Sequence, residues 1–233
     1  MKPMIALDFI VARTYLAQEA VVSIPIGIVV SFFIGNVYTM PAAFAALVPF
    51  VIGFSLFALD EKNDWEQFRL ALPLSRENVI TGRYATCALL AVAGILFGAV
   101  ICLLTIAIAS IAPSLPNASQ IAQSTEAMPA IAAPCAGAIA SLIMLAIAIP
   151  AIAKCGMTKA VRFIPLIAVL LVCLAIGVFG GSEAMAVVEA TIDEASSTTA
   201  GFTLLLFAAA VVAVAIYAAS CALSCKLYRH REL

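Results

Sequence analysis

Six long apolar runs without a charged residue restrict how this chain can fold. They occupy residues 20–37, 41–59, 85–112, 130–153, 163–181 and 201–225. Each run reaches the roughly 18 residues that a helix needs to cross the hydrocarbon core of a bilayer. We therefore predict an all-α integral membrane protein with six transmembrane helices, which together form one transmembrane domain of residues 1–233.

The composition agrees with this class of protein. Of all residues, 65% are hydrophobic and 11% are charged, whereas about 25% of the residues of a soluble domain are charged. The seven cysteines lie in or at the ends of the apolar runs, and only Cys221 and Cys225 have a spacing that a metal site uses. We interpret them as small apolar residues and expect no disulfide framework or metal centre. The expected partner is the lipid bilayer, and no nucleic-acid partner is expected.

The basic residues indicate how the helices are oriented. If the N-terminus is cytoplasmic, all 12 Lys and Arg residues fall in segments on the inner side of the membrane. The outer segments then contain no basic residue, and their charged residues are Glu126, Glu183, Glu189, Asp193 and Glu194. This distribution obeys the positive-inside rule. We predict that the N-terminus and the C-terminus are both cytoplasmic.

Residues 2–19 precede the first apolar run and alternate polar and apolar side chains with a helical period. At 100° per residue, their charged side chains fall within roughly 140° of arc. These side chains are Lys2, Asp8, Arg13 and Glu19. We predict an N-terminal helix that lies in the membrane interface. The alternative is that these residues extend the first transmembrane helix into the cytoplasm.

The two longer outer segments differ in character. Residues 113–129 are rich in Pro, Ser and Ala, a composition that predicts a flexible loop. Residues 182–200 place apolar and acidic side chains on different helical faces. That segment is either a short helix that enters the outer leaflet or an acidic loop in solvent.

A polar stretch, residues 60–84, separates the second and third runs and contains the only Trp of the chain. Trp65, Phe68 and Leu72 recur with helical spacing and form one apolar face, and Pro73 ends the helix because it has no N–H to donate. We predict a short amphipathic helix on the cytoplasmic surface, suited to insertion in a groove of another protein. The alternative is that this face lies on the membrane, with Trp65 as an interface anchor.

The predicted spans lack the groups that intramembrane chemistry needs. None of the six runs contains Asp, Glu, Lys, Arg or His, and proton relays and ion sites are built from such residues. The sequence has no GxxxxGK[ST] phosphate loop, so the chain does not hydrolyse ATP by that mechanism. We expect no catalytic residue and no cofactor in this chain. A pathway built from it is either passive or takes its energy from a partner.

The polar stretch also carries a family resemblance. Its segments Asp60-Glu61-Lys62, Trp65, Leu72-Pro73-Leu74-Ser75-Arg76 and Arg83-Tyr84 resemble the signature of bacterial type 2 ABC transporter permeases. Within this family, the sequence is similar to a subgroup that includes exporters of phenol-soluble modulin peptides and related antimicrobial-resistance permeases. The layout of six spans with both ends inside extends the resemblance across the chain.

This resemblance implies a permease subunit of an ATP-driven ABC exporter in the bacterial cytoplasmic membrane. Residues 60–72 would form the coupling helix and dock on a separate ABC ATPase subunit, which binds ATP and Mg²⁺. A second permease copy, in a homodimer or a heterodimer, would complete the pathway. The residues that the resemblance places in the coupling region are Asp60, Glu61, Lys62, Trp65, Phe68, Leu72, Pro73 and Arg76.

Two further questions stay open at the level of the sequence. Uncharged spans suit an amphipathic peptide, antibiotic or lipid-like cargo better than a small ion, but the chain could also be a non-transporting assembly or immunity protein that binds a partner through residues 60–84. Gly94 and Gly98 lie four residues apart in the third run and allow the close approach of another helix. That helix belongs either to a second permease copy or to the same chain.

Overall fold

The computed structural model describes residues 2–63, 76–123, 126–160 and 198–229. These ranges are helical apart from short connections, and no strand occurs in them. The helices are α1 (Lys2–Ile34), α2 (Thr39–Lys62), α4 (Arg76–Ile111), α5 (Ala118–Gln123), α6 (Ala127–Cys155) and α9 (Thr199–Arg229). A further helical turn begins at Met157, after Gly156 ends α6 with a φ of 79°.

Five of these helices, α1, α2, α4, α6 and α9, are long and apolar enough to cross a membrane. Helices α2, α6 and α9 each contain one of the predicted runs and continue beyond it at both ends, whereas α1 and α4 begin before their runs and end at Ile34 and Ile111, short of the predicted ends at 37 and 112. The 36 residues of α4 correspond to about 54 Å at 1.5 Å per residue, so this helix extends well past a hydrocarbon core of about 30 Å. The predicted span 163–181 and the outer segment 182–197 lie outside the described residues. The chain is therefore a multi-pass membrane protein, and the sixth span stays a prediction.

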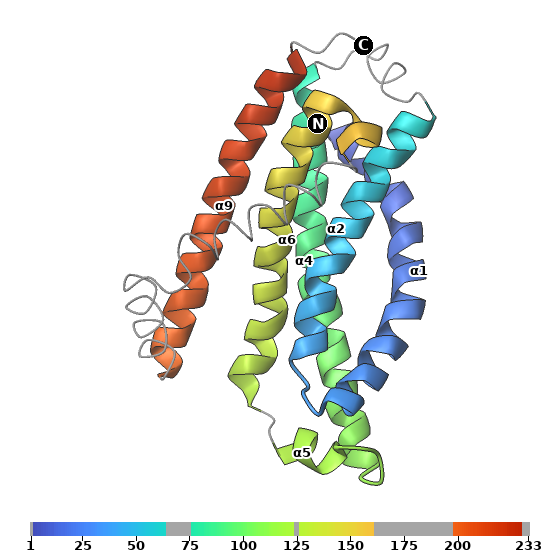
Figure 1. The fold of residues 1–233 in the computed structure, drawn as a ribbon, viewed down its shortest axis with the longest axis vertical. Coiled ribbons are helices and arrows are strands. Elements are labelled where there is room, and N and C mark those ends of the chain that lie inside the picture. Colours follow the sequence, from blue (N-terminus) through green and yellow to red (C-terminus); the bar gives the residue numbers. More distant parts are fainter. Residues whose placement is uncertain (1, 64–75, 124–125, 161–197, 230–233) are drawn as a thin grey trace.

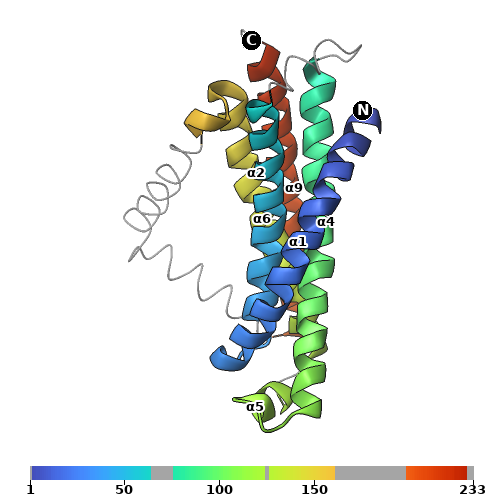
Figure 2. The same cartoon turned by 90° about the vertical axis from the view of Figure 1, so that its right-hand side faces the viewer.

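The helices form an elongated bundle in which α2, α4 and α6 contact one another (Figure 1). Helix α1 lies along α2 and α4, and α9 lies along α6 and α4 (Figure 2). The start of α1 and α4 and the C-terminal ends of α2, α6 and α9 meet at one end of the bundle, whereas α5 lies at the other (Figure 1). We call the first of these the polar end. The Lys and Arg residues of the described ranges lie in the helix halves nearest this end, or in the turn that follows α6.

Three glycines bring the central helices into close contact. A Cβ added at Gly94 would lie 2.6 Å from Pro49 of α2, and one added at Gly98 would lie 2.7 Å from the carbonyl oxygen of Pro41. A Cβ at Gly137 of α6 would collide with the carbonyl oxygen of Ala42. The close approach expected at Gly94 and Gly98 therefore occurs within the chain, which was one of the two alternatives.

The prediction of a separate interfacial helix is wrong, because α1 runs without a break from Lys2 to Ile34. The predicted charged arc is also divided, because Asp8 is buried whereas Arg13 is exposed. Asp8 is buried together with Met4 and Ala12, whereas Leu7 and Ile10 are exposed. Part of the apolar surface of this segment therefore faces away from the bundle, and the bundle accepts Asp8 because a basic side chain meets it there.

The prediction of a flexible loop at 113–129 is also wrong in part, because these residues contain α5 and the start of α6. Ala118 and Ile121 of α5 are buried in a cluster with Phe32, Val37 and Ala109. Before α5, Asn117 adopts a φ of 56°, and its side-chain amide donates to the carbonyl oxygen of Phe32 at 2.9 Å. This contact satisfies a carbonyl group that the end of α1 would otherwise leave without a partner.

Candidate functional site

A buried cluster of charged side chains lies at the polar end, where α1, α2 and α4 meet. Arg83 of α4 is 1% exposed. Its Nη1 lies 3.1 Å from Oδ1 of Asp8 on α1, and its Nη2 pairs with Oδ2 of Asp60 on α2. The guanidinium group thus joins two other helices through two different nitrogens. We call Asp8, Asp60 and Arg83 the charged cluster.

Other side chains complete the surroundings of this cluster. Oγ1 of Thr86 on α4 lies 3.3 Å from Oδ2 of Asp8. The guanidinium carbon of Arg83 lies 4.9 Å from the ring centroid of Phe57, a distance at which a cation is attracted to an aromatic face. The helical spacing explains where the two carboxylates lie. Asp8 shares the buried face of α1 with Met4 and Ala12, and Asp60 lies one turn after the buried Leu56 on α2.

The neighbouring carboxylate, Glu61, binds another part of the chain. It accepts hydrogen bonds from the backbone N–H of Met157 and from the backbone N–H of Thr158, the latter at 3.1 Å, and from the Thr158 hydroxyl. These N–H groups open the helical turn after α6, where a helix has unsatisfied donors and a partial positive charge. Glu61 therefore ties the end of α2 to the segment that follows α6.

Tyr84, the residue after Arg83, ties α4 to α9. Its hydroxyl lies 2.7 Å from Oγ of Ser220 and 2.8 Å from Oγ of Ser224. In return, the hydroxyl of Tyr217 donates to the carbonyl oxygen of Tyr84 at 2.8 Å, and Oγ of Ser220 donates to the carbonyl oxygen of Ala146 on α6 at 2.6 Å. Successive residues on α4 point about 100° apart, so Arg83 and Tyr84 contact different neighbours.

The structure places the predicted coupling residues as follows. Asp60 and Glu61 lie side by side at the end of α2 and make the contacts given above, and Lys62 is exposed. Arg76 is the first residue of α4. Trp65, Phe68, Leu72 and Pro73 lie outside the described residues. The contact of these eight residues with an ATPase subunit therefore stays a prediction.

Sequence reasoning missed Asp8, and it named Arg83 and Tyr84 only as part of a family signature. The sequence did contain a pattern that could have indicated a buried Asp8. Met4, Asp8 and Ala12 recur every four residues and so share one face of a helix. The small Ala12 and the position of Asp8 between two apolar residues favour a buried face. The charge of Asp8 led instead to an assignment to the surface.

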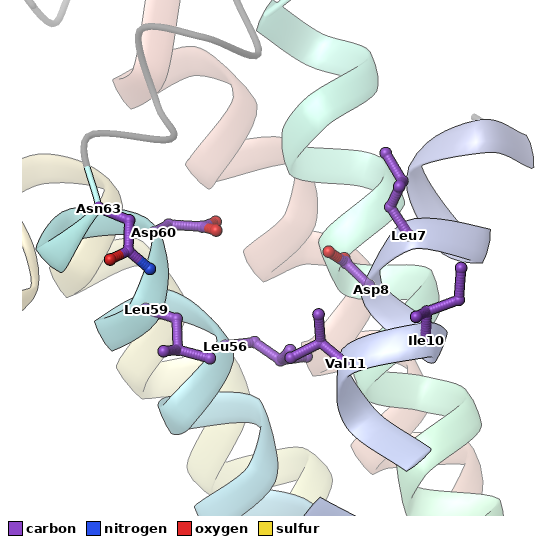
Figure 3. Close-up of a pocket in the computed structure, with 8 residues that line it drawn as sticks. All are labelled: Leu7, Asp8, Ile10, Val11, Leu56, Leu59, Asp60 and Asn63. Atoms are coloured by element: carbon purple, nitrogen blue, oxygen red, sulfur yellow. The ribbon is translucent and has the colours of Figure 1, made fainter. Parts of the chain in front are cut away.

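Cavities lie between the described helices, and two of them are relevant to function. One, of about 510 Å³, lies between α4, α6 and α9 and is lined by apolar or small side chains, among them Ala91, Ala138, Leu142 and Phe207. The other, of about 290 Å³, lies between α1 and α2 at the polar end (Figure 3). Within the described ranges, no three His, Cys, Asp or Glu side chains gather in a way that could hold a metal ion.

Five long apolar helices among the described residues, with a buried ion-paired cluster at one end of their bundle, define a multi-pass membrane protein. The comparison with protein families then identifies the family. The model of the ABC-2 family of transporter proteins matches residues 3–229, and the chain belongs to that family. It is thus a permease subunit of an ABC transporter, a kind of subunit that works with an ATPase partner. A comparison with curated proteins found no match, and a comparison with solved structures found none.

Proposed function

We propose that this permease belongs to an ATP-driven exporter of the bacterial cytoplasmic membrane and that residues 60–84 couple it to the ATPase subunit. The observation that carries this proposal is the position of the two residues that flank segment 64–75. Asn63 follows α2 and Arg76 begins α4, and both lie at the polar end (Figure 1). A partner that binds this segment is therefore adjacent to the charged cluster.

The cargo that we propose is an amphipathic peptide, antibiotic or lipid-like molecule, of the kind handled by the phenol-soluble modulin subgroup. The 510 Å³ cavity between α4, α6 and α9 supports this choice, because the described residues that line it include no ionisable group other than the Cys135 thiol. Its volume falls within the range of about 300–1,000 Å³ that is usual for ligand sites. These described residues offer no charged ligand to an ion, whereas their alkyl side chains could contact the apolar face of an amphipathic molecule or an acyl chain.

A substitution in the predicted coupling helix tests the role of residues 60–84. We expect Phe68→Asp to abolish co-purification of the ATPase subunit, because burial of a large apolar side chain in a partner contributes about 2 kcal/mol and a buried carboxylate adds a desolvation cost. The amount of permease in the membrane should not change. Lys154→Asp, which alters charge at an exposed position in the last turn of α6, outside the predicted coupling residues, is the matched control and should keep the ATPase subunit. If Phe68→Asp retains the ATPase subunit and export, the face of this helix is a membrane anchor.

The orientation is the second testable part of this proposal. Asn63 and Ser119 are exposed at opposite ends of the bundle, and by the positive-inside rule the polar end is cytoplasmic. In a background without native cysteines, Ser119→Cys should react with an impermeant maleimide added to intact cells. Asn63→Cys should react only after the membrane is opened. Labelling of Asn63→Cys in intact cells would reverse the orientation.

A second permease copy, in a homodimer or a heterodimer, completes the proposed transporter. Gly94 and Gly98 are not available to form its interface, since both pack against α2 of the same chain. Cross-linking in native membranes tests this part, and a product of the mass of two permease chains is the expected result.

A further inference from the structure

A cavity separates the first turns of α1 from α2. On α1 it is lined by Leu7, Asp8, Ile10 and Val11, and on α2 by Leu56, Leu59, Asp60 and Asn63. Its volume is about 290 Å³. In Figure 3, Asp8 and Asp60 point toward one another across this space. The start of α1 is thus not packed tightly against the end of α2.

One turn further along, the same two helices are in close contact. Ala12 is fully buried in an apolar cluster with Val48, Ile52 and Leu56 of α2 and Leu90 of α4. Close apolar packing resists displacement, whereas a cavity leaves room for it. The cavity therefore leaves room between the first turns of α1 and the end of α2, while on the other side Met4 is buried next to Gly82 of α4.

Arg83 spans the gap between these two helix ends. Its Nη1 lies 3.1 Å from Oδ1 of Asp8, and its Nη2 pairs with Asp60. A guanidinium group presents several donors in a fixed fork, so a displacement of either carboxylate acts on the same rigid group. Asp60 lies only a few residues before segment 64–75, and the neighbouring Glu61 is bonded to Met157 and Thr158.

We propose that Arg83 is a positioning residue that transmits a displacement of the end of α2 to the start of α1. The displacement arises when the ATPase subunit acts on segment 64–75, and the cavity between α1 and α2 gives the first turns of α1 space to respond. This inference rests on the proposed function, since it requires an ATPase partner at the polar end. Coupling of this kind needs a contiguous physical connection between the two sites, and the charged cluster supplies it.

The test uses the permease purified together with its ATPase subunit, in a background without native cysteines. Leu7→Cys reports on α1 and Asn63→Cys on the end of α2, and both positions are exposed. The rate of maleimide labelling is measured without nucleotide and with ATP and vanadate, and the ratio of the two rates removes differences in basal reactivity. In the parent complex, we expect this ratio to depart several-fold from one at both positions.

Asp8→Asn should then abolish the nucleotide response at Leu7 and leave the response at Asn63 unchanged. Asp60→Asn, which opens the contact on the other side of Arg83, should also abolish the response at Leu7 and is the second variant if Asp8→Asn does not fold. Asp8→Glu, which keeps the charge, should restore it. Tyr84→Phe is the matched control, because it changes the adjacent buried residue and removes only contacts to α9. It should keep both responses.

The outcomes separate this inference from the proposed function. The inference would be overturned if the response at Leu7 survived in both Asp8→Asn and Asp60→Asn. It would also be overturned if Tyr84→Phe lost the response at Leu7, because any weakening of the polar end would then have the same effect. A parent complex that responds at Asn63 but not at Leu7 would also overturn it. By contrast, a permease that purifies without an ATPase subunit would remove the proposed function itself.

Discussion

Replacement of Arg83 by Met is expected to destabilise the protein by about 3–5 kcal/mol, the usual cost of removing one partner of a buried ion pair. The carboxylates of Asp8 and Asp60 would remain at the junction of three helices, and Asp8 is 1% exposed. Their mutual repulsion and their desolvation would both disfavour the packed bundle. The midpoint of unfolding in mild detergent, measured by thermal denaturation, should fall sharply.

A charge-neutral triple variant provides the internal control for this prediction. Arg83→Met combined with Asp8→Asn and Asp60→Asn removes all three charges, and a buried ion cluster replaced by neutral groups often costs little. Its midpoint should therefore lie well above that of Arg83→Met alone. Lys62→Met, which removes an exposed charge at the same end, should have an effect near zero. If Arg83→Met is as stable as the parent, the charged cluster is not formed in the membrane.

The second large effect is expected for Gly137→Val. A Cβ at Gly137 would collide with the carbonyl oxygen of Ala42 and lie 2.9 Å from Cβ of Ala45. Backbone atoms cannot rotate away as a side chain can, so α2 and α6 would have to separate. Overpacking of an interior costs about 1–3 kcal/mol, and occasionally more, and the backbone contact places this variant at or above the upper limit. We expect low abundance in the membrane and a reduced midpoint of unfolding.

Ala136→Val is the matched control for the glycine substitution. It adds the same side chain at the preceding residue of α6, where the surface is exposed. Its abundance and midpoint should equal those of the parent. A Gly137→Val protein with parental stability would show that α2 and α6 do not approach as closely as described, and the assignment of the central packing would then be wrong.

The sequence predicted the transmembrane helices well where the determining factor is local. An apolar run of sufficient length needs only the bilayer to become a helix. Helices α2, α6 and α9 each contain the run assigned to them, and α4 contains its run except for the last residue. Most of the predicted runs were shorter than the helices that contain them, because helices continue past the hydrocarbon core until a turn stops them. Gly156, with a positive φ, is such a stop after α6.

The charged cluster depends instead on partners that are distant in the chain. Nothing near Asp8 in the sequence shows that Arg83 pairs with it and with Asp60, so Asp8 was grouped with the other charged side chains of residues 2–19 in an interfacial helix. The same limit applies to α5, where Pro and Ser residues favoured a loop. Ala118 and Ile121 are buried against α1 and α4, and this tertiary contact outweighs the local preference.

The central claim is that the chain acts as the permease of an ATP-driven transporter, and purification from native membranes tests it most directly. The protein, isolated in mild detergent through an affinity tag, should carry an ABC ATPase subunit in fixed proportion, and the complex should hydrolyse ATP. The ATPase subunit should be lost from Phe68→Asp and kept by Lys154→Asp. A parent protein that is folded and purifies without any ATPase subunit would contradict the claim and favour a non-transporting membrane protein.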